Sequence, residues 1–196
     1  MASLFEMLQN QLSGNTLTEI SKRIGADEAG TATAMTTALP VLLGALARNT
    51  STPDGATALH RALAKDHDGR ILDTIGQHLA NPDAHTGNGI LGHLLGDRRT
   101  MVEQQVSKVS GLEASSVSSL LTTVAPLLMG LLGRAQQQGG LNPASLAGLI
   151  GSEEQGMVAK SPGLGRLAQL LDSNHDGSIA DDLARVGKGL LGKLGR

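Results

Sequence analysis

Val117-Ser-Ser-Leu-Leu-Thr-Thr-Val-Ala-Pro-Leu-Leu-Met-Gly-Leu-Leu-Gly133 is the stretch of sequence that decides the fold. It carries no charge and is rich in Leu, which predicts that it belongs to a long helix. Its hydroxyl side chains and the central Pro126 argue against a helix that crosses ~30 Å of hydrocarbon. Since a proline inside a helix removes a main-chain donor, we expect a kink at Pro126.

The same pattern occurs earlier in the chain. Residues 20–48 align without a gap on residues 106–134 at a shift of 86 positions, and ten of the 29 aligned positions are identical. This favours an internal repeat of helix, Gly turn and Pro-kinked long helix over a chance resemblance between Leu- and Ala-rich helices. The identical pairs are Ser21/Ser107, Lys22/Lys108, Gly25/Gly111, Thr36/Thr122, Thr37/Thr123, Pro40/Pro126, Leu42/Leu128, Gly44/Gly130, Leu46/Leu132 and Arg48/Arg134.

Composition agrees with an all-α fold. Of the 196 residues, 33 are Leu, 26 Gly and 23 Ala, whereas Phe5 is the single aromatic and Cys is absent. Helix formers therefore dominate strand formers. The lack of Cys excludes disulfides, Cys-ligated zinc and thiol chemistry, and the lack of aromatics excludes a base-stacking platform. Apolar spacing predicts helices over residues 1–12, 17–24, 27–48, 56–65 and 71–79.

We expect two related helical units, residues 1–100 and 101–170, packed together, followed by an acidic loop and a basic terminal helix over residues 171–196. That loop resembles the first part of a calcium-binding loop, with oxygen-bearing residues at alternate positions and Gly177 at the sharp bend. The usual Glu at position 12 is replaced by Leu183. The candidate calcium ligands are Asp172, Asn174, Asp176, Ser178, Asp181 and Asp182.

The alternative interpretation of this loop is a turn whose carboxylates stabilise a helix N-terminus. A similar segment, residues 66–73, aligns with residues 174–181 at a shift of 108 positions. There, Ala64 stands at the first ligand position and Arg70 brings a positive charge close to the loop. We therefore expect residues 66–73 to form a structural turn rather than a cation site.

The chain resembles the bacterial domain-of-unknown-function family 937, which includes the YidB-like proteins. The resemblance implies an all-helical fold and no established activity. It is carried by Ala38-Leu-Pro-Val-Leu-Leu-Gly-Ala-Leu-Ala-Arg-Asn49, Asp66-His-Asp-Gly-Arg-Ile-Leu-Asp73, Gly89-Ile-Leu-Gly-His-Leu-Leu-Gly96, Val124-Ala-Pro-Leu-Leu-Met-Gly-Leu-Leu-Gly-Arg134 and Leu171-Asp-Ser-Asn-His-Asp-Gly-Ser-Ile-Ala-Asp-Asp-Leu183.

No pattern in the sequence predicts a catalytic or cofactor-binding site. The clustered histidines are not at metal-binding spacing, and no nucleophile elbow or phosphate-binding Gly loop occurs, so we expect no enzyme. We expect the histidines to lie at the surface or at helix caps. They are His60, His67, His78, His85 and His93.

The sequence therefore predicts a cytoplasmic, non-enzymatic structural or scaffold protein that self-associates and binds calcium at its C-terminal loop. The alternative is a nucleic-acid-binding helical module using Lys22, Arg23 and Lys108, or the Arg98-Arg99 pair, although the net charge of −2 argues against it. No integral membrane segment is expected. The basic tail, residues 184–196, is interpreted as a terminal helix, with contact to a membrane surface or a partner groove as the alternative.

Overall fold

The structure is a computed structural model that describes residues 3–160. These residues contain helices and no β-strand, which confirms the all-α fold. The elements are α1 (Leu4–Gln11), α2 (Asn15–Ile24), α3 (Glu28–Asn49), α4 (Pro53–Asp66), the 3₁₀ helix η1 (Arg70–Asp73), α5 (Ile75–Ala80), α6 (Ala84–Leu95), the 3₁₀ helix η2 (Gly96–Arg98), α7 (Arg99–Ser110), α8 (Ala114–Gly139) and α9 (Pro143–Lys160).

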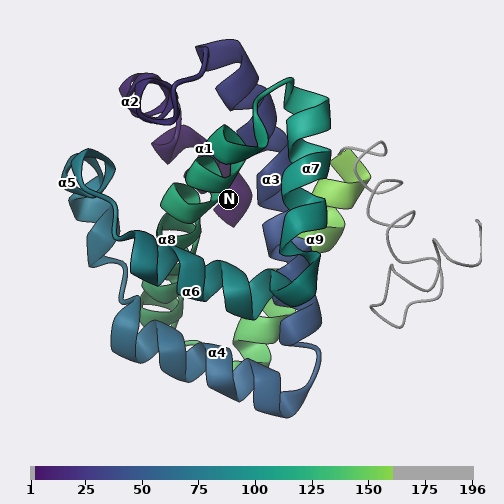
Figure 1. The fold of residues 1–196 in the computed structure, drawn as a ribbon. Coiled ribbons are helices and arrows are strands. Elements are labelled where there is room, and N and C mark those ends of the chain that lie inside the picture. Colours follow the sequence, from purple (N-terminus) through teal and green to yellow (C-terminus); the bar gives the residue numbers. More distant parts are fainter. Residues whose placement is uncertain (1–2, 161–196) are drawn as a thin grey trace, which may run out of the picture. The chain divides into compact units, whose positions relative to one another are not determined.

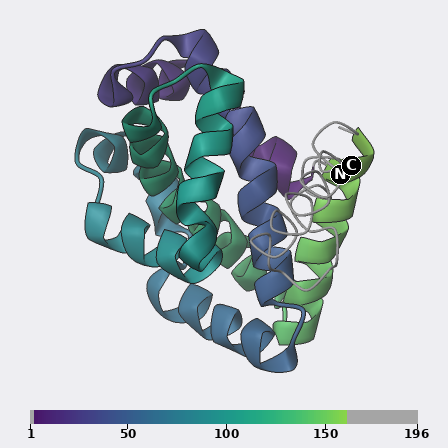
Figure 2. The same ribbon diagram turned by 45° about the vertical axis from the view of Figure 1, so that its right-hand side comes forward.

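The chain divides into two compact units, residues 1–155 and 156–196, and the first contains the helices described here except for the last five residues of α9. Helix α8 forms the centre of this unit. It packs against α1, α2, α3, α4, α6, α7 and η1 (Figure 1). Helix α3 packs against α2, α6 and α7 and runs beside α7 in both views (Figure 2). Our division into units 1–100 and 101–170 stays a prediction.

The apolar composition of α8 follows from this central position. Every residue from Leu120 to Gly133 is buried, and Leu121 and Leu127 are fully buried. Both α3 and α8 are long and apolar enough to cross a membrane, but 67% and 83% of their apolar windows are buried inside the protein. Core helices of soluble proteins have the same length and composition, so these two properties alone do not indicate a membrane protein.

The two segments aligned in the sequence have the same local structure. In each, a helix ends at a Gly in the left-handed conformation, Gly25 (φ 67°) and Gly111 (φ 74°), and a long helix follows. Pro40 and Pro126 lie within these long helices, which continue through them. The shared arrangement is what an internal repeat would produce, and the repeat itself stays a prediction.

One helix predicted from the sequence is divided in the structure. Residues 71–79 form part of η1 and most of α5, separated at Thr74. Thr74 has φ −128° and ψ 33°, outside the helical region, and its N–H bonds to the Ile71 carbonyl oxygen at 3.2 Å. The predicted acidic loop and basic terminal helix, residues 171–196, lie outside the described residues.

Candidate functional site

The Asp66–Asp73 segment is the clearest candidate site among the described residues, and its shape begins with the end of α4. His67 caps this helix with its N–H bonded to the Leu63 carbonyl oxygen at 3.2 Å. Gly69 follows with φ 92°, a conformation that glycine adopts without steric penalty. The Asp68 carboxylate accepts a hydrogen bond from the N–H of Arg70 at 3.1 Å and pairs with its guanidinium. The chain thus turns sharply into η1.

The turn packs against two glycines of α8. A Cβ atom at Gly133 would overlap the carbonyl oxygen of His67, and one at Gly130 would overlap the Cγ2 methyl of Ile71. In the other direction, a Cβ atom at Gly69 would lie 2.8 Å from the Cβ of Arg134. The turn and α8 are therefore in close contact that only glycine permits on both sides.

Arg134 of α8 binds the turn through two polar contacts. Its Nη2 donates to the carbonyl oxygen of Gly69 at 2.7 Å and to Oδ1 of Asp73 at 2.7 Å. The Arg134 side chain is 30% exposed and that of Asp73 is 67% exposed, so water weakens the ionic part of the contact. The Gly69 carbonyl is the more buried acceptor, because Gly69 itself is buried. We refer to the turn, Gly130, Gly133 and Arg134 together as the turn–helix clasp.

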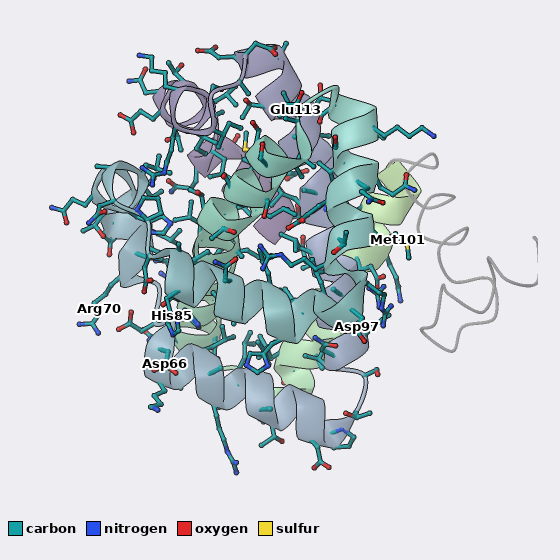
Figure 3. All side chains as sticks on the ribbon, viewed as in Figure 1. Asp66, Arg70, His85, Asp97, Met101 and Glu113 are labelled. Atoms are coloured by element: carbon teal, nitrogen blue, oxygen red, sulfur yellow. The ribbon has the colours of Figure 1, made fainter. Side chains whose placement is uncertain are left out.

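A small cavity of about 190 Å³ lies beside the clasp, lined in part by Asp66, His67, Asp68, His78, Asp83 and Pro126. Figure 3 shows Asp66, Arg70 and His85 along this edge of the molecule, with Arg70 pointing away from the helices. Burial lowers the pKa of His67, and the nearby Asp66 carboxylate opposes that effect. The imidazole is thereby kept neutral near pH 7.

The aspartates around the cavity have structural hydrogen bonds. The Arg70 N–H, assisted by the guanidinium charge, lowers the pKa of Asp68. The hydroxyl and N–H of Thr86 lower the pKa of Asp83, whose carboxylate caps the N-terminus of α6. Both carboxylates are therefore ionised at neutral pH and hold local backbone groups. Their oxygens stabilise a turn and a helix end.

Pro126 of α8 also lines the cavity. Because proline has no N–H, the Thr122 carbonyl oxygen lacks its usual helical donor. This oxygen faces Gly87 of α6, where an added Cβ atom would overlap it. The neighbouring Thr123 carbonyl oxygen accepts a hydrogen bond from Nε2 of His78 at 2.9 Å. A carbonyl only accepts, so His78 carries its proton on Nε2.

A larger, open groove of about 800 Å³ lies among α2, α5, α6 and α8. Lys22, Arg23, Asn88, Ser118 and Ser119 contribute polar atoms to it. Several of these atoms already have partners within the chain: Arg23 donates to the carbonyl oxygens of Leu79 and Ala80, both at 3.3 Å. The groove is open and is lined by both polar and apolar residues, without a set of converging groups that indicates a reaction.

The structure places the other predicted residues as follows. All six candidate calcium ligands, Asp172 to Asp182, lie outside the described residues. His60 and His78 bond to carbonyl oxygens, His67 caps α4, and His85 and His93 are exposed. Within residues 3–160, no three His, Asp or Glu side chains come together to hold a metal ion.

The cations considered for nucleic-acid binding lie on separate elements. Lys22 and Arg23 are on α2, Arg98 is in η2, and Arg99 and Lys108 are on α7. Arg99 bonds to Glu103 at 2.8 Å and to the Ser118 hydroxyl at 3.1 Å. Two of the five candidate cations, Arg23 and Arg99, are therefore bound to their own chain.

The sequence analysis missed Gly130, Gly133 and Arg134 as partners of the turn. The sequence did contain an indication of this contact, because two glycines and an arginine interrupt a stretch of otherwise large, apolar side chains. Small residues in a buried helix indicate close approach of another segment. They do not identify that segment, and 61 positions separate Asp73 from Arg134.

Comparison with known proteins gives one match. A family model described as "Bacterial protein of unknown function (DUF937)" matches residues 6–135, a range that contains both α3 and the turn–helix clasp. No curated protein matches the chain. No solved structure matches it either.

Proposed function

Since the chain belongs to the DUF937 family of bacterial proteins, whose function is unknown, we propose from its residues that it is a non-enzymatic structural or scaffold protein that self-associates. The observation that carries this proposal is the turn–helix clasp. An Asp-His-Asp-Gly turn, the most chemically suggestive motif among the described residues, is used to dock one helical segment on another.

The polar groups around the cavity support a structural role. Asp68 holds the turn, Asp83 caps α6, His78 binds a main-chain oxygen of α8, and Asp73 binds Arg134. Each of these side chains contributes to holding a helix or turn in place. A general acid or base needs an atom within reach of a substrate, and these atoms are bonded to backbone groups or to side chains of the protein itself.

Support for self-association comes from the helices themselves. Helices as short as α1 and α5 are unstable in isolation and depend on neighbouring surfaces. Val109 on α7 and Met7 on α1 are large apolar side chains that are 50% and 39% exposed, respectively. A second copy of the chain is a partner that would cover such side chains.

Light scattering on the full chain, with calcium and with a chelator, tests self-association. We expect a mass of at least twice 20.1 kDa in one or both conditions. Val109→Asp should lower the fraction of oligomer if α7 is part of the interface, whereas its exposed neighbour substituted as Lys108→Ser serves as the control. A monomeric mass in both conditions would remove self-association from the proposal.

Calcium binding at the C-terminal loop is the second part of the proposal. It is supported by the spacing of Asp172, Asn174 and Asp176 ahead of Gly177, the pattern that hard cations require. Isothermal calorimetry with calcium should give heat for the unmodified chain and for Asp68→Ala, and none for Asp172→Ala. Equal heats of binding for all three proteins, or no heat from the unmodified chain, would favour the interpretation of the loop as a turn and helix cap.

A further inference from the structure

The groove of about 800 Å³ among α2, α5, α6 and α8 is large enough to hold a small organic molecule. Helix α2 contacts both α5 and α8, and α6 contacts α8, so these four helices border it (Figure 1). Leu79, Thr122 and Thr123 line the groove although they are buried, so they form its floor. The groove therefore lies directly on the central helix α8.

Small side chains keep this groove open. Gly76, Ala80 and Ala84 line it from α5 and α6. Gly76 lies inside α5, where glycine weakens a helix relative to alanine. No atom lies within 4 Å of a Cβ added there, and its φ is not in the left-handed region, so neither packing nor backbone conformation requires the glycine. What the glycine preserves is the open space beside it.

Two cations of α2 line one side of the groove. Nη1 of Arg23 donates to the carbonyl oxygens of Leu79 and Ala80, both at 3.3 Å, which holds the guanidinium at the end of α5. Its other N–H groups remain as donors. The Lys22 ammonium, by contrast, makes no hydrogen bond or ion pair within residues 3–160. The groove thus has an uncommitted positive charge beside an arginine that is already oriented.

The polar side chains that α6 and α8 contribute can donate as well. Oδ1 of Asn88 accepts a hydrogen bond from the Thr122 hydroxyl at 3.4 Å, so the amide NH₂ is its remaining polar group. Oγ of Ser118 accepts a hydrogen bond from Arg99 at 3.1 Å and can still donate its own proton. The Ser119 hydroxyl has no partner among the described residues. This supply of unused donors favours a ligand that is rich in acceptor oxygens.

We propose that this groove binds a small phosphate ester that carries hydroxyl groups, of which a sugar phosphate is the simplest example. Lys22 and Arg23 hold the phosphate group, and Ser119 and Asn88 bond to other oxygen atoms of the ligand. Glu19, which also lines the groove one helical turn before the two cations, accepts a hydrogen bond from a ligand hydroxyl. A ligand site of this kind goes beyond the structural role proposed above and does not depend on self-association.

The charges in the groove suit a phosphate monoester. Such a group carries a charge of about −1.5 to −2 at pH 7, and Lys22 and Arg23 each supply one positive charge. Phosphate oxygens are bound in proteins by the side chains of Arg, Lys, Ser and Asn, all of which line this groove. Because the Glu19 carboxylate repels a second anionic group, it selects a ligand that presents an uncharged hydroxyl there.

A strand of nucleic acid suits the groove less well than a small ligand does. Its backbone needs a series of cations, whereas Arg98, Arg99 and Lys108 are in η2 and α7 and do not line the groove. Stacking of bases needs aromatic side chains, and Phe5 is the single aromatic residue of the sequence. A small ligand with one phosphate group requires neither feature.

Amide NMR shifts of the full chain test the proposal, with glucose 6-phosphate, glucose and inorganic phosphate as probes. We expect glucose 6-phosphate to give saturable shifts of the amides of Gly76, Asn88 and Ser119. Inorganic phosphate should shift the same amides with roughly tenfold weaker affinity, since it lacks the hydroxyl contacts, and glucose should leave them unchanged. Absence of saturable shifts with glucose 6-phosphate would overturn the proposal, as would equal affinity for either of the other probes.

A substitution that fills the groove tests the location of the site. Gly76→Leu should abolish the shifts at Asn88 and Ser119, because its side chain occupies the open space. Gly92→Leu is the matched control, since a Cβ at Gly92 also meets no atom within 4 Å but Gly92 does not line the groove. Both variants should remain folded in urea unfolding, because leucine favours a helix more than glycine does. Unchanged affinity of Gly76→Leu for glucose 6-phosphate would contradict the proposal.

Lys22→Gln tests the charge at an exposed position, where the substitution leaves the core intact. We expect it to weaken binding of glucose 6-phosphate by roughly tenfold, since it removes a charge-assisted contact. Lys108→Gln, at the aligned exposed position of α7, should bind as tightly as the unmodified chain. Equal affinities of the two variants would overturn the proposal. So would a short single-stranded DNA that shifts the same amides at lower concentration than glucose 6-phosphate, because that result would assign the groove to nucleic acid.

Discussion

Gly87 of α6 lies directly against the main-chain carbonyl oxygen of Thr122 in α8, where no other residue type fits without displacement of that oxygen. Pro126 leaves this oxygen without a helical donor, so the two helices meet at a point where α8 exposes a polar backbone atom. Because glycine has no side chain, the backbone of α6 can lie close to this oxygen atom. The pair therefore fixes the spacing of α6 and α8.

Gly87→Ala is expected to destabilise the protein by about 1–3 kcal/mol, because the added methyl must push α6 away from α8. Gly92→Ala, in the same helix, is the matched control. No atom lies within 4 Å of a Cβ there, so the better helix propensity of Ala should stabilise the protein by up to ~1 kcal/mol. Urea unfolding followed by circular dichroism measures both. Equal effects of the two substitutions would contradict the contact.

Arg134→Ala should destabilise the protein by roughly 1–3 kcal/mol, since it removes a charged donor from the partly buried Gly69 carbonyl oxygen. Asp73→Ala should have a smaller effect, at most about 1 kcal/mol, because its side chain is largely exposed. A double-mutant cycle separates the two contacts. If Asp73→Ala proved as harmful as Arg134→Ala, the carbonyl contact would not be the main one.

The turn–helix clasp should loosen in mild acid. Burial lowers the pKa of His67 in the folded protein below its unfolded value of ~6.5, so the unfolded chain binds more protons just below that pH. Stability contributed by neutral His67 is complete above about pH 6.5. It is lost as the pH falls from there to the folded pKa.

His67→Gln should therefore flatten the decrease in unfolding free energy between about pH 7 and pH 5, while His85→Gln, at an exposed position, should leave it unchanged. Urea unfolding at several pH values provides the measurement. Burial raises the pKa of Glu154, which acts in the opposite direction, and comparison with the unmodified chain cancels its contribution. A slope that survives in His67→Gln would assign the acid sensitivity to other groups.

The sequence predicted those helices that carry clear local signals, whereas α6 and α9 were not predicted. The stretch from Val117 to Gly133 indicated a long helix, and Gly25 and Gly111 indicated the ends of α2 and α7. The division of residues 71–79 at Thr74 was missed, since apolar spacing at Ile71, Leu72, Ile75 and Leu79 suits a single helix as well as two short ones.

The turn–helix clasp could be anticipated only in part. The Asp66–Asp73 segment was recognised as a turn because Gly69 and the flanking aspartates determine its conformation locally. Its partner was not recognised, because periodicity shows which face of α8 is apolar and not which distant segment covers it. Gly130 and Gly133 indicate a close approach, and the contact with His67 and Ile71 requires the three-dimensional structure.

The central position of α8 also has a consequence for synthesis of the chain on the ribosome. Every element that packs substantially on this helix, from α1 to α7, precedes it in the sequence. Proteins emerge N-terminus first, and early segments begin to fold before later ones are made. The most membrane-like segment of the described chain is thus synthesised after all the segments that cover it. The order of the helices along the chain therefore limits the time during which α8 lacks its partners and could aggregate or insert into a lipid bilayer.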